Sequence, residues 1–346
     1  MSGAAPLLVE HPHPNPAWLA RLTEDILEPD LPIIDPHHHL WDRPGSRYYL
    51  DELLADTRSG HNVVATVFLQ CFWAYRTTGP EELRPVGETE FVASVVQEAE
   101  RRKSRVRACA GIVGYADLRL GDRADAVLEA HLAAGGGRFR GIRHIAARHP
   151  DLLGSITTAP PLGLMGEASF RAGFARLAAH GLSFDAWQYH TQLDELLDLV
   201  RQFPNVPVVI NHVGGPLGVG PFRGKRDEVF VAWRASMRQL AGCPNVSVKL
   251  GGLAMAINGF DFHQQVLPPS SGELAQAWRP WMAECIEAFG AARCMFESNF
   301  PVDKGMCSYP VLWNAFKRIA AGASDDEKRA LFHDTAARFY RIETAR

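Results

Sequence analysis

The segment Asp35-Pro36-His37-His38-His39 holds the residues with the clearest potential for chemistry. Alternate side chains of an extended strand share a face, so His37 and His39 point one way and His38 the other. Two imidazoles in this spacing can bind one metal ion, or they can flank a substrate group as neutral donors and acceptors. A third histidine, His212, follows another apolar run and completes this candidate catalytic set.

Further polar residues stand at the ends of other apolar runs. Arg143 is the candidate clamp for a substrate carboxylate, because a guanidinium fork matches a carboxylate in two hydrogen bonds. Lys249 is unusual because it lies inside an apolar run and the chain has few lysines. Aromatic residues after the runs suit a flat ring or a lactone. The other candidates for substrate binding are His144, Tyr49, Gln70, Trp187 and Tyr189.

Short apolar runs alternate with helical periodicity along the chain, which predicts repeated βα units. The expected strands are Leu31–Asp35, Val63–Leu69, Arg107–Val113, Phe139–Ile145, Leu182–Trp187, Val206–His212, Val246–Leu250 and Cys294–Ser298. The expected helices between them are Glu90–Lys103, Arg123–Ala134, Ala168–His180, Leu193–Phe203, Val229–Ala241 and Leu274–Phe289. Eight such units predict an α/β fold, a single (β/α)8 TIM barrel. A doubly wound sheet is less favoured, because no Gly-rich dinucleotide turn follows the first strand.

The barrel explains why polar residues gather at strand ends, since chemistry in this fold sits at the carboxyl ends of the strands. Long loops after the fourth strand (Ala146–Glu167) and the seventh (Gly251–Ser271) are expected to cap the site. We expect residues 1–30 to form an N-terminal extension and residues 31–346 to form the barrel.

Composition excludes several classes of function. The chain has 346 residues and a net charge of −3, which argues against a nucleic-acid partner. The chain contains no run of about 18 apolar residues, the length that would predict a membrane span. Its first residues do not resemble a signal peptide. Six scattered cysteines are typical of reduced thiols. We therefore expect a cytoplasmic protein that acts on a small molecule, and leave homo-oligomer formation open.

Several motifs recur in a familiar order, from His37-x-His39 through Gly141–His144, Gly181–Asp185, His212–Gly214 and Lys249–Leu253 to Glu297–Pro301. Over about residues 28–342 the chain resembles the amidohydrolase superfamily, in the amidohydrolase-related branch. That branch includes 2-pyrone-4,6-dicarboxylate lactonase, L-fuconolactonase and sulfomuconolactone hydrolase. The resemblance implies a (β/α)8 barrel and a hydrolase that opens a lactone or similar cyclic ester in the breakdown of a sugar acid or an aromatic compound.

One position departs from the family pattern. The family places an Asp at the end of strand eight, where it activates the water, and this chain has Asn299. A neutral amide can orient a water but cannot take up its proton. The carboxylates that could replace it are Asp303, Asp185 and Glu297.

The resemblance leaves metal dependence open. Dinuclear amidohydrolases use four histidines, a bridging Lys or Glu, and the strand-eight Asp that is absent here. His37, His39 and His212 could hold one Zn²⁺ with an open position for water. We favour a lactonase that needs no metal, in which these histidines and Lys249 stabilise the oxyanion that develops on the substrate carbonyl. The alternatives to a lactonase are a metal-dependent decarboxylase or hydratase of an aromatic or unsaturated acid, and a non-catalytic ligand-binding barrel.

Overall fold

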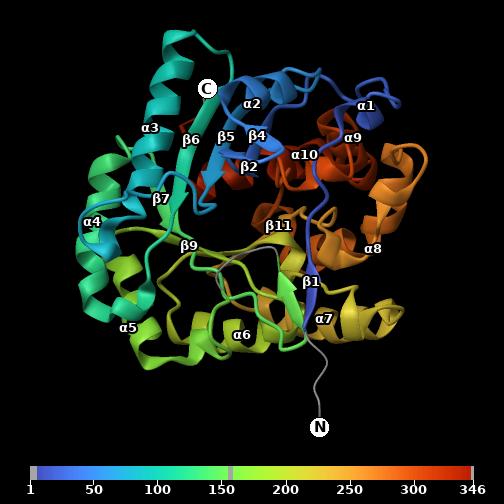
Figure 1. The fold of residues 1–346 in the computed structure, drawn as a ribbon. Coiled ribbons are helices and arrows are strands. Elements are labelled where there is room, and N and C mark those ends of the chain that lie inside the picture. Colours follow the sequence, from blue (N-terminus) through green and yellow to red (C-terminus); the bar gives the residue numbers. More distant parts are fainter. Residues whose placement is uncertain (1–5, 155–158, 344–346) are drawn as a thin grey trace.

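Eight parallel strands form the centre of the molecule in the computed structural model, which describes residues 6–154 and 159–343 (Figure 1). The strands are β2 (Ile33–His38), β5 (Val63–Leu69), β6 (Arg107–Gly114), β7 (Phe139–Ile142), β9 (Ser183–Ala186), β10 (Val208–Ile210), β11 (Val246–Leu250) and β12 (Cys294–Phe296). They lie in the order β12-β11-β10-β9-β7-β6-β5-β2. Runs such as Val63–Leu69 are buried almost throughout, as expected of strands covered on both faces.

The first and last strands of this sheet meet at their carboxyl ends. The main-chain amide of Asn299 donates to the carbonyl of His37 at 2.9 Å, and the amide of His39 donates to the carbonyl of Phe300 at 2.8 Å. These bonds bring the sheet close to a full ring. They also place the β2 histidines directly beside the residues that follow β12.

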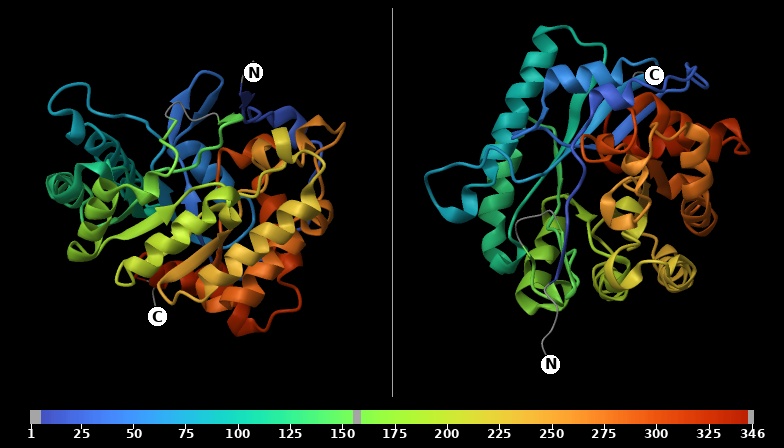
Figure 2. Two further views of the ribbon diagram at one scale, coloured as in Figure 1. Left: turned by 90° about the horizontal axis from the view of Figure 1, so that it is seen from below. Right: turned by 45° about the vertical axis from the view of Figure 1, so that its right-hand side comes forward.

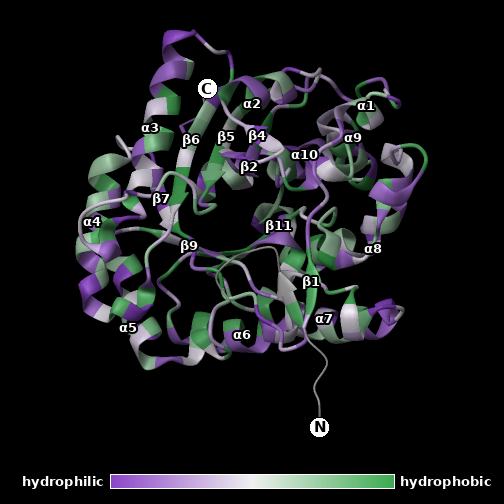
Figure 3. Cartoon of the chain, in the orientation of Figure 1, coloured by the Kyte–Doolittle hydropathy of each residue, from purple (hydrophilic) through white to green (hydrophobic). Residues whose placement is uncertain are grey.

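Helices surround the ring of strands (Figure 1). The longer ones pair apolar inner faces with polar outer faces, which Figure 3 shows as mixed colours on α4 and α5. In α6 the inner face is built from Leu193, Leu196, Leu197 and Val200, all buried. The helices are α1 (Pro16–Leu19), α2 (Leu50–Thr57), α3 (Val86–Arg101), α4 (Ala124–Ala134), α5 (Ala168–Ala179), α6 (Leu193–Gln202), α7 (Arg226–Ala241), α8 (Ser271–Phe289), α9 (Tyr309–Ile319), α10 (Asp325–Arg329) and α11 (Thr335–Phe339).

The barrel interior is apolar at one end and polar at the other. Val67, Val209 and Met295 pack inside it against Ala336 and Tyr340, which come from α11 and the residue after it. The C-terminal helix therefore closes the amino ends of the strands. The polar groups lie above this plug, toward the carboxyl ends.

Two small sheets lie outside the barrel. β3 (Trp41–Arg43) pairs antiparallel with β4 (Ser46–Tyr48), and β1 (Leu7–Val9) pairs parallel with β8 (Leu152–Gly154). Figure 2 shows the N-terminal segment beside β8 on one side of the barrel. The described part of the expected N-terminal extension thus lies against the barrel.

The observed architecture confirms the expected TIM barrel. Each expected strand is present, with ends shifted by up to three residues; β2, for example, extends to His38. The long loops after β7 and β11 lie where expected, although residues 155–158 of the first lie outside the described residues. Among the helices that the structure describes, none is both long and apolar enough to cross a bilayer.

His131, a buried residue in the helical layer, allows a prediction about pH. Its Nδ1 lies 2.8 Å from the Thr89 hydroxyl and its Nε2 lies 2.9 Å from the carbonyl oxygen of Tyr115. Burial lowers the pKa of His131 to about 4. Because the unfolded chain binds this proton near pH 6.5, the imidazole contributes stability above that pH and loses it as the pH falls toward 4.

We therefore expect the stability of the wild type relative to His131→Gln to fall by about 1.4 kcal/mol between pH 7.5 and pH 5.5. Urea unfolding of both proteins at the two pH values measures this difference. A difference that stays constant with pH would contradict a neutral buried imidazole at this position.

Candidate active site

His37 lies at the centre of the polar end of the barrel and is fully buried. Its Nδ1 lies 2.6 Å from Oε2 of Glu297 and 3.3 Å from the ammonium of Lys249. Its Nε2 accepts from the guanidinium of Arg143 at 3.2 Å. Both ring nitrogens of His37 are therefore engaged by protein groups.

His212 follows β10 and shares the carboxylate of Glu297 with His37. Oε1 of Glu297 accepts from Nδ1 of His212 at 2.7 Å and from its main-chain amide at 3.0 Å. The proton of a neutral His212 is thus held on Nδ1, which leaves Nε2 as an acceptor. Gly252 lies against this ring, where a Cβ would come within 2.3 Å of Nδ1. The carboxylate and Gly252 fix the orientation of the imidazole.

His39 presents a second acceptor. Its Nδ1 donates to the carbonyl of Leu69 at 2.9 Å, so a neutral ring carries its lone pair on Nε2. Trp41 stacks on this ring with 5.5 Å between the ring centroids. The centroids of His39 and His212 lie 5.0 Å and 4.6 Å from that of His37. The three imidazoles therefore form one group.

Burial keeps all three imidazoles neutral at pH 7. Desolvation is the largest cause that lowers the pKa of His37, His39 and His212, and the positive charge of Arg143 acts in the same direction. For His212 the carboxylate of Glu297 opposes this effect in part. Neutral imidazoles can accept a proton at neutral pH.

Lys249 forms a buried ion pair below the histidines. Its ammonium donates to Oδ1 of Asp185 at 2.7 Å, and both side chains are fully buried. The same oxygen accepts from the Tyr340 hydroxyl at 2.8 Å and from the Asn211 amide at 3.0 Å. Three donors therefore converge on one oxygen of Asp185. Lys249 thus contacts His37 on the side away from Arg143.

Arg143 is a buried cation at the end of β7. It donates to the main-chain carbonyl of Gln70, whose side-chain amide donates to the carbonyl of Arg143 at 3.3 Å. Within the described residues no carboxylate lies within 4.0 Å of its guanidinium, and its Nε has no hydrogen-bond partner. Arg143 therefore keeps hydrogen-bonding capacity for a group that binds in the site.

Asn299 and Asp303 are hydrogen bonded to each other. The Asn299 amide donates to Oδ1 of Asp303 at 2.7 Å, and the main-chain amide of Ala254 donates to Oδ2 at 3.3 Å. Burial raises the pKa of Asp303 well above its ordinary value, and the charge of Glu297 adds to this effect. Asp303 begins a short 3-10 turn, Asp303–Gly305, and is fully buried there. Its carboxyl group holds the Asn299 side chain in place.

The remaining candidates divide into two groups. Trp187 packs edge-on against His212 with centroids 4.6 Å apart, and Tyr189 packs against Trp187. His144, in contrast, accepts from the main-chain amide of Leu118 and packs against aromatic residues of the outer layer. Tyr49 begins α2 and packs against Phe91. The structure therefore places Trp187 against His212 and Gln70 against Arg143, whereas His144 and Tyr49 contact other residues.

The arrangement around His37 bears on whether the site fits a metal ion. Within the described residues, ligating atoms of His37, His212 and Glu297 lie within 4.8 Å of one another. Glu297, however, already joins the two imidazoles, and the cations of Lys249 and Arg143 lie on either side of His37. Two positive charges at this distance oppose the binding of a divalent cation. This arrangement does not fit a metal ion with His37 as a ligand.

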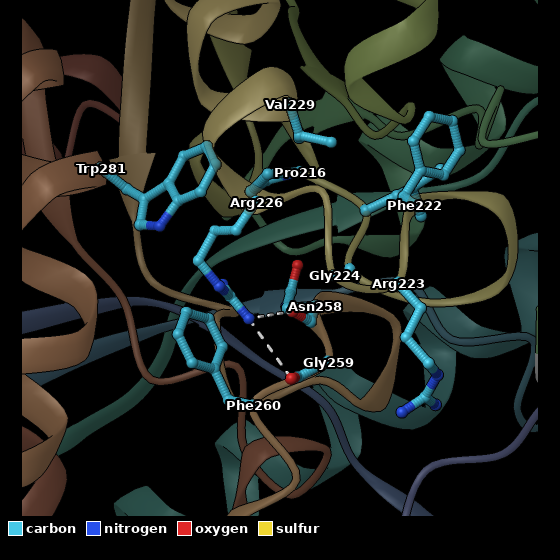
Figure 4. Close-up of a pocket in the computed structure, with 12 residues that line it drawn as sticks. Pro216, Phe222, Arg223, Gly224, Arg226, Val229, Asn258, Gly259, Phe260 and Trp281 are labelled. Carbon is cyan, nitrogen blue, oxygen red and sulfur yellow. Dashed lines mark hydrogen bonds between the residues drawn. The ribbon is translucent and has the colours of Figure 1, made fainter.

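A separate pocket of about 160 Å³ lies between the loops that follow β10 and β11 (Figure 4). Arg226 lies over the ring of Phe260 at 4.0 Å and donates to the main-chain carbonyls of Asn258 and Gly259. None of the catalytic candidates lines this pocket. The guanidinium of Arg226 is thus occupied by contacts within the protein.

Comparison with known proteins identifies the family. The amidohydrolase family Amidohydro_2 matches residues 34–342, so the chain belongs to it, and the expected resemblance is confirmed. Protein y4mH of Sinorhizobium fredii is 36% identical over 90% of this chain and 99% of its own length. The L-fucono-1,5-lactonase of Burkholderia multivorans is 26% identical over 89% of this chain and 96% of its own length.

Solved structures agree on the fold. An amidohydrolase from Burkholderia multivorans, crystallised with bound zinc, superposes with a TM-score of 0.70 and 24% identity. The match covers 90% of this chain and 99% of that protein. At this level of identity the similarity supports the barrel architecture.

Proposed function

We propose that this protein hydrolyses a lactone that carries a carboxylate, and that His212, oriented by Glu297, is the general base. His212 donates to Oε1 of Glu297 through both Nδ1 and its main-chain amide, so its Nε2 is free to accept a proton. A relative of this chain is named L-fucono-1,5-lactonase, which supports a lactone substrate.

With His212 as the general base, the reaction does not need a carboxylate at the position of Asn299. His212 takes a proton from water at Nε2 while the water oxygen bonds to the lactone carbonyl carbon. His39, whose Nε2 is also an acceptor, orients the same water. The ring C–O bond then breaks, and the imidazolium returns its proton to the leaving oxygen, which yields a hydroxy acid. Glu297 stabilises the imidazolium between these steps.

Arg143 supplies the specificity in this proposal. A buried guanidinium without a carboxylate partner is costly unless a ligand provides the negative charge. A carboxylate on the lactone would accept two hydrogen bonds from Arg143 and would be held beside His37. The decarboxylase alternative needs a bound divalent cation, which the two cations beside His37 oppose.

A panel of lactones tests the function. Proton release is followed in weak buffer for five- and six-membered lactones with and without a carboxylate, and the hydroxy acid is identified by mass spectrometry. We expect ring opening of at least one carboxylated lactone. If no lactone is opened, the proposal is wrong, and a ligand-binding barrel becomes the better description.

Replacing Arg143 tests the carboxylate clamp. In Arg143→Gln we expect KM for a carboxylated lactone to rise about 10- to 100-fold, the effect of losing one or two charge-assisted hydrogen bonds. The KM for an uncharged lactone should change far less. The matched control is Arg140→Gln, because Arg140 lies on the same strand and donates to main-chain carbonyls. If KM rises equally for carboxylated and uncharged lactones, Arg143 does not bind a substrate carboxylate. It would then stabilise the oxyanion that forms on the lactone carbonyl.

A further inference from the structure

The N-terminal strap, defined as residues 7–13, crosses the carboxyl end of the barrel. It begins at β1, where the Leu7 amide donates to the carbonyl of Asp151 at 2.9 Å. Its main chain then lies on Gly305, where a Cβ would come within 2.1 Å of the Pro12 carbonyl oxygen. Figure 2 shows this segment over the same end of the barrel as β8. The strap therefore joins the loop after β7 to the turn after β12.

His11 lies in the middle of the strap, next to Pro12, whose carbonyl oxygen lies against Gly305 in the turn after β12. Its Nδ1 is buried and has no hydrogen-bond partner in the part of the chain that the structure describes. Burial, with a smaller contribution from the charge of His212, lowers the pKa of His11 to about 4. A buried ring nitrogen without a partner is costly unless a group that enters the site supplies the missing hydrogen bond.

The burial of the catalytic group makes the strap relevant to substrate binding. His39, Arg143, Trp187 and His212 are each at most 5% exposed. These residues follow the carboxyl ends of β2, β7, β9 and β10, at the end of the barrel that the strap crosses. A substrate that reaches His212 from this end therefore meets the strap.

On this geometry, and resting on the proposed function, we infer that His11 is a substrate-contacting residue, which hydrogen bonds to the lactone through Nδ1. His11 is neutral at pH 7 and thus adds a hydrogen bond without adding charge. It acts on binding and has no part in the proton transfer. The strap is accordingly a wall of the active site, and the N-terminal segment contributes to specificity.

Steady-state kinetics of strap variants test this inference in the full-length protein. We expect His11→Ala to raise KM for the best lactone of the panel about three- to tenfold, the effect of one neutral hydrogen bond, with kcat nearly unchanged. His11→Asn should restore most of the KM, because the Asn amide can occupy the position of Nδ1. The matched control is His13→Ala, since His13 is exposed and lies over Gly45.

The outcomes separate this inference from the proposed function. A raised KM in His11→Ala, with an unchanged melting temperature and rescue by His11→Asn, supports a contact with the substrate. If the wild type opens a lactone and His11→Ala has the same KM, the inference is wrong while the proposed function stands. The same holds if KM rises only together with a lower melting temperature and His11→Asn gives no rescue. A wild type that opens no lactone overturns both.

Discussion

His212→Gln should lower kcat for lactone ring opening by about 10²- to 10⁴-fold, the contribution expected of a general base. The substitution removes Nε2, the acceptor that Glu297 holds in place. Steady-state kinetics on the best lactone measures the loss. The control is His131→Gln, which replaces a buried histidine of the helical layer and should leave kcat unchanged.

Glu297→Gln extends this prediction to the carboxylate. A neutral amide cannot stabilise the imidazolium, so kcat should fall by about 10²-fold or more. Because the two residues act as one unit, the double variant His212→Gln/Glu297→Gln should be little slower than the slower single variant. Losses that multiply in the double variant would contradict a base made of the pair.

Lys249→Met should lower the free energy of unfolding by about 3–5 kcal/mol, the usual effect of breaking a buried ion pair. It leaves the anion of Asp185 without its 2.7 Å partner and removes a positive charge 3.9 Å from Glu297. Urea unfolding at pH 7.5 measures the change. The loss should be smaller in Lys249→Met/Asp185→Asn, where the unpaired anion is also removed. A single variant as stable as the wild type would contradict a tightly paired Lys249.

Much of the fold can be predicted from the sequence because each strand is indicated by a short, local run of apolar residues. The run Val63–Leu69 is apolar on both faces, which is sufficient to predict a strand of a parallel sheet, and it is observed with the same ends. The ends of strands are harder to predict, because polar residues such as His37 and His38 can continue the extended backbone of a strand after its apolar run has ended. The placement of candidates at strand ends also follows from local signals, since it needs only the barrel rule.

The pairing of the candidates could not be predicted in the same way. Arg143 and His144 are neighbours on an extended segment, so only one of them can face the barrel interior. The double contact of Glu297 with His37 and His212 depends on three strands that meet only in the folded barrel. Tyr340, whose hydroxyl donates to Asp185, comes from the C-terminal part of the chain, where no local pattern indicates that it lies near the site.

The most direct test of a metal-independent base is the rate of ring opening of a carboxylated lactone before and after treatment with a strong chelator. We expect the protein to open the lactone and to retain its rate after chelation, since a neutral imidazole supplies the base. A rate that is lost on chelation and restored by Zn²⁺ would contradict this expectation. That result would mean that a metal-bound water is the nucleophile and that Arg143 and Lys249 move away from His37.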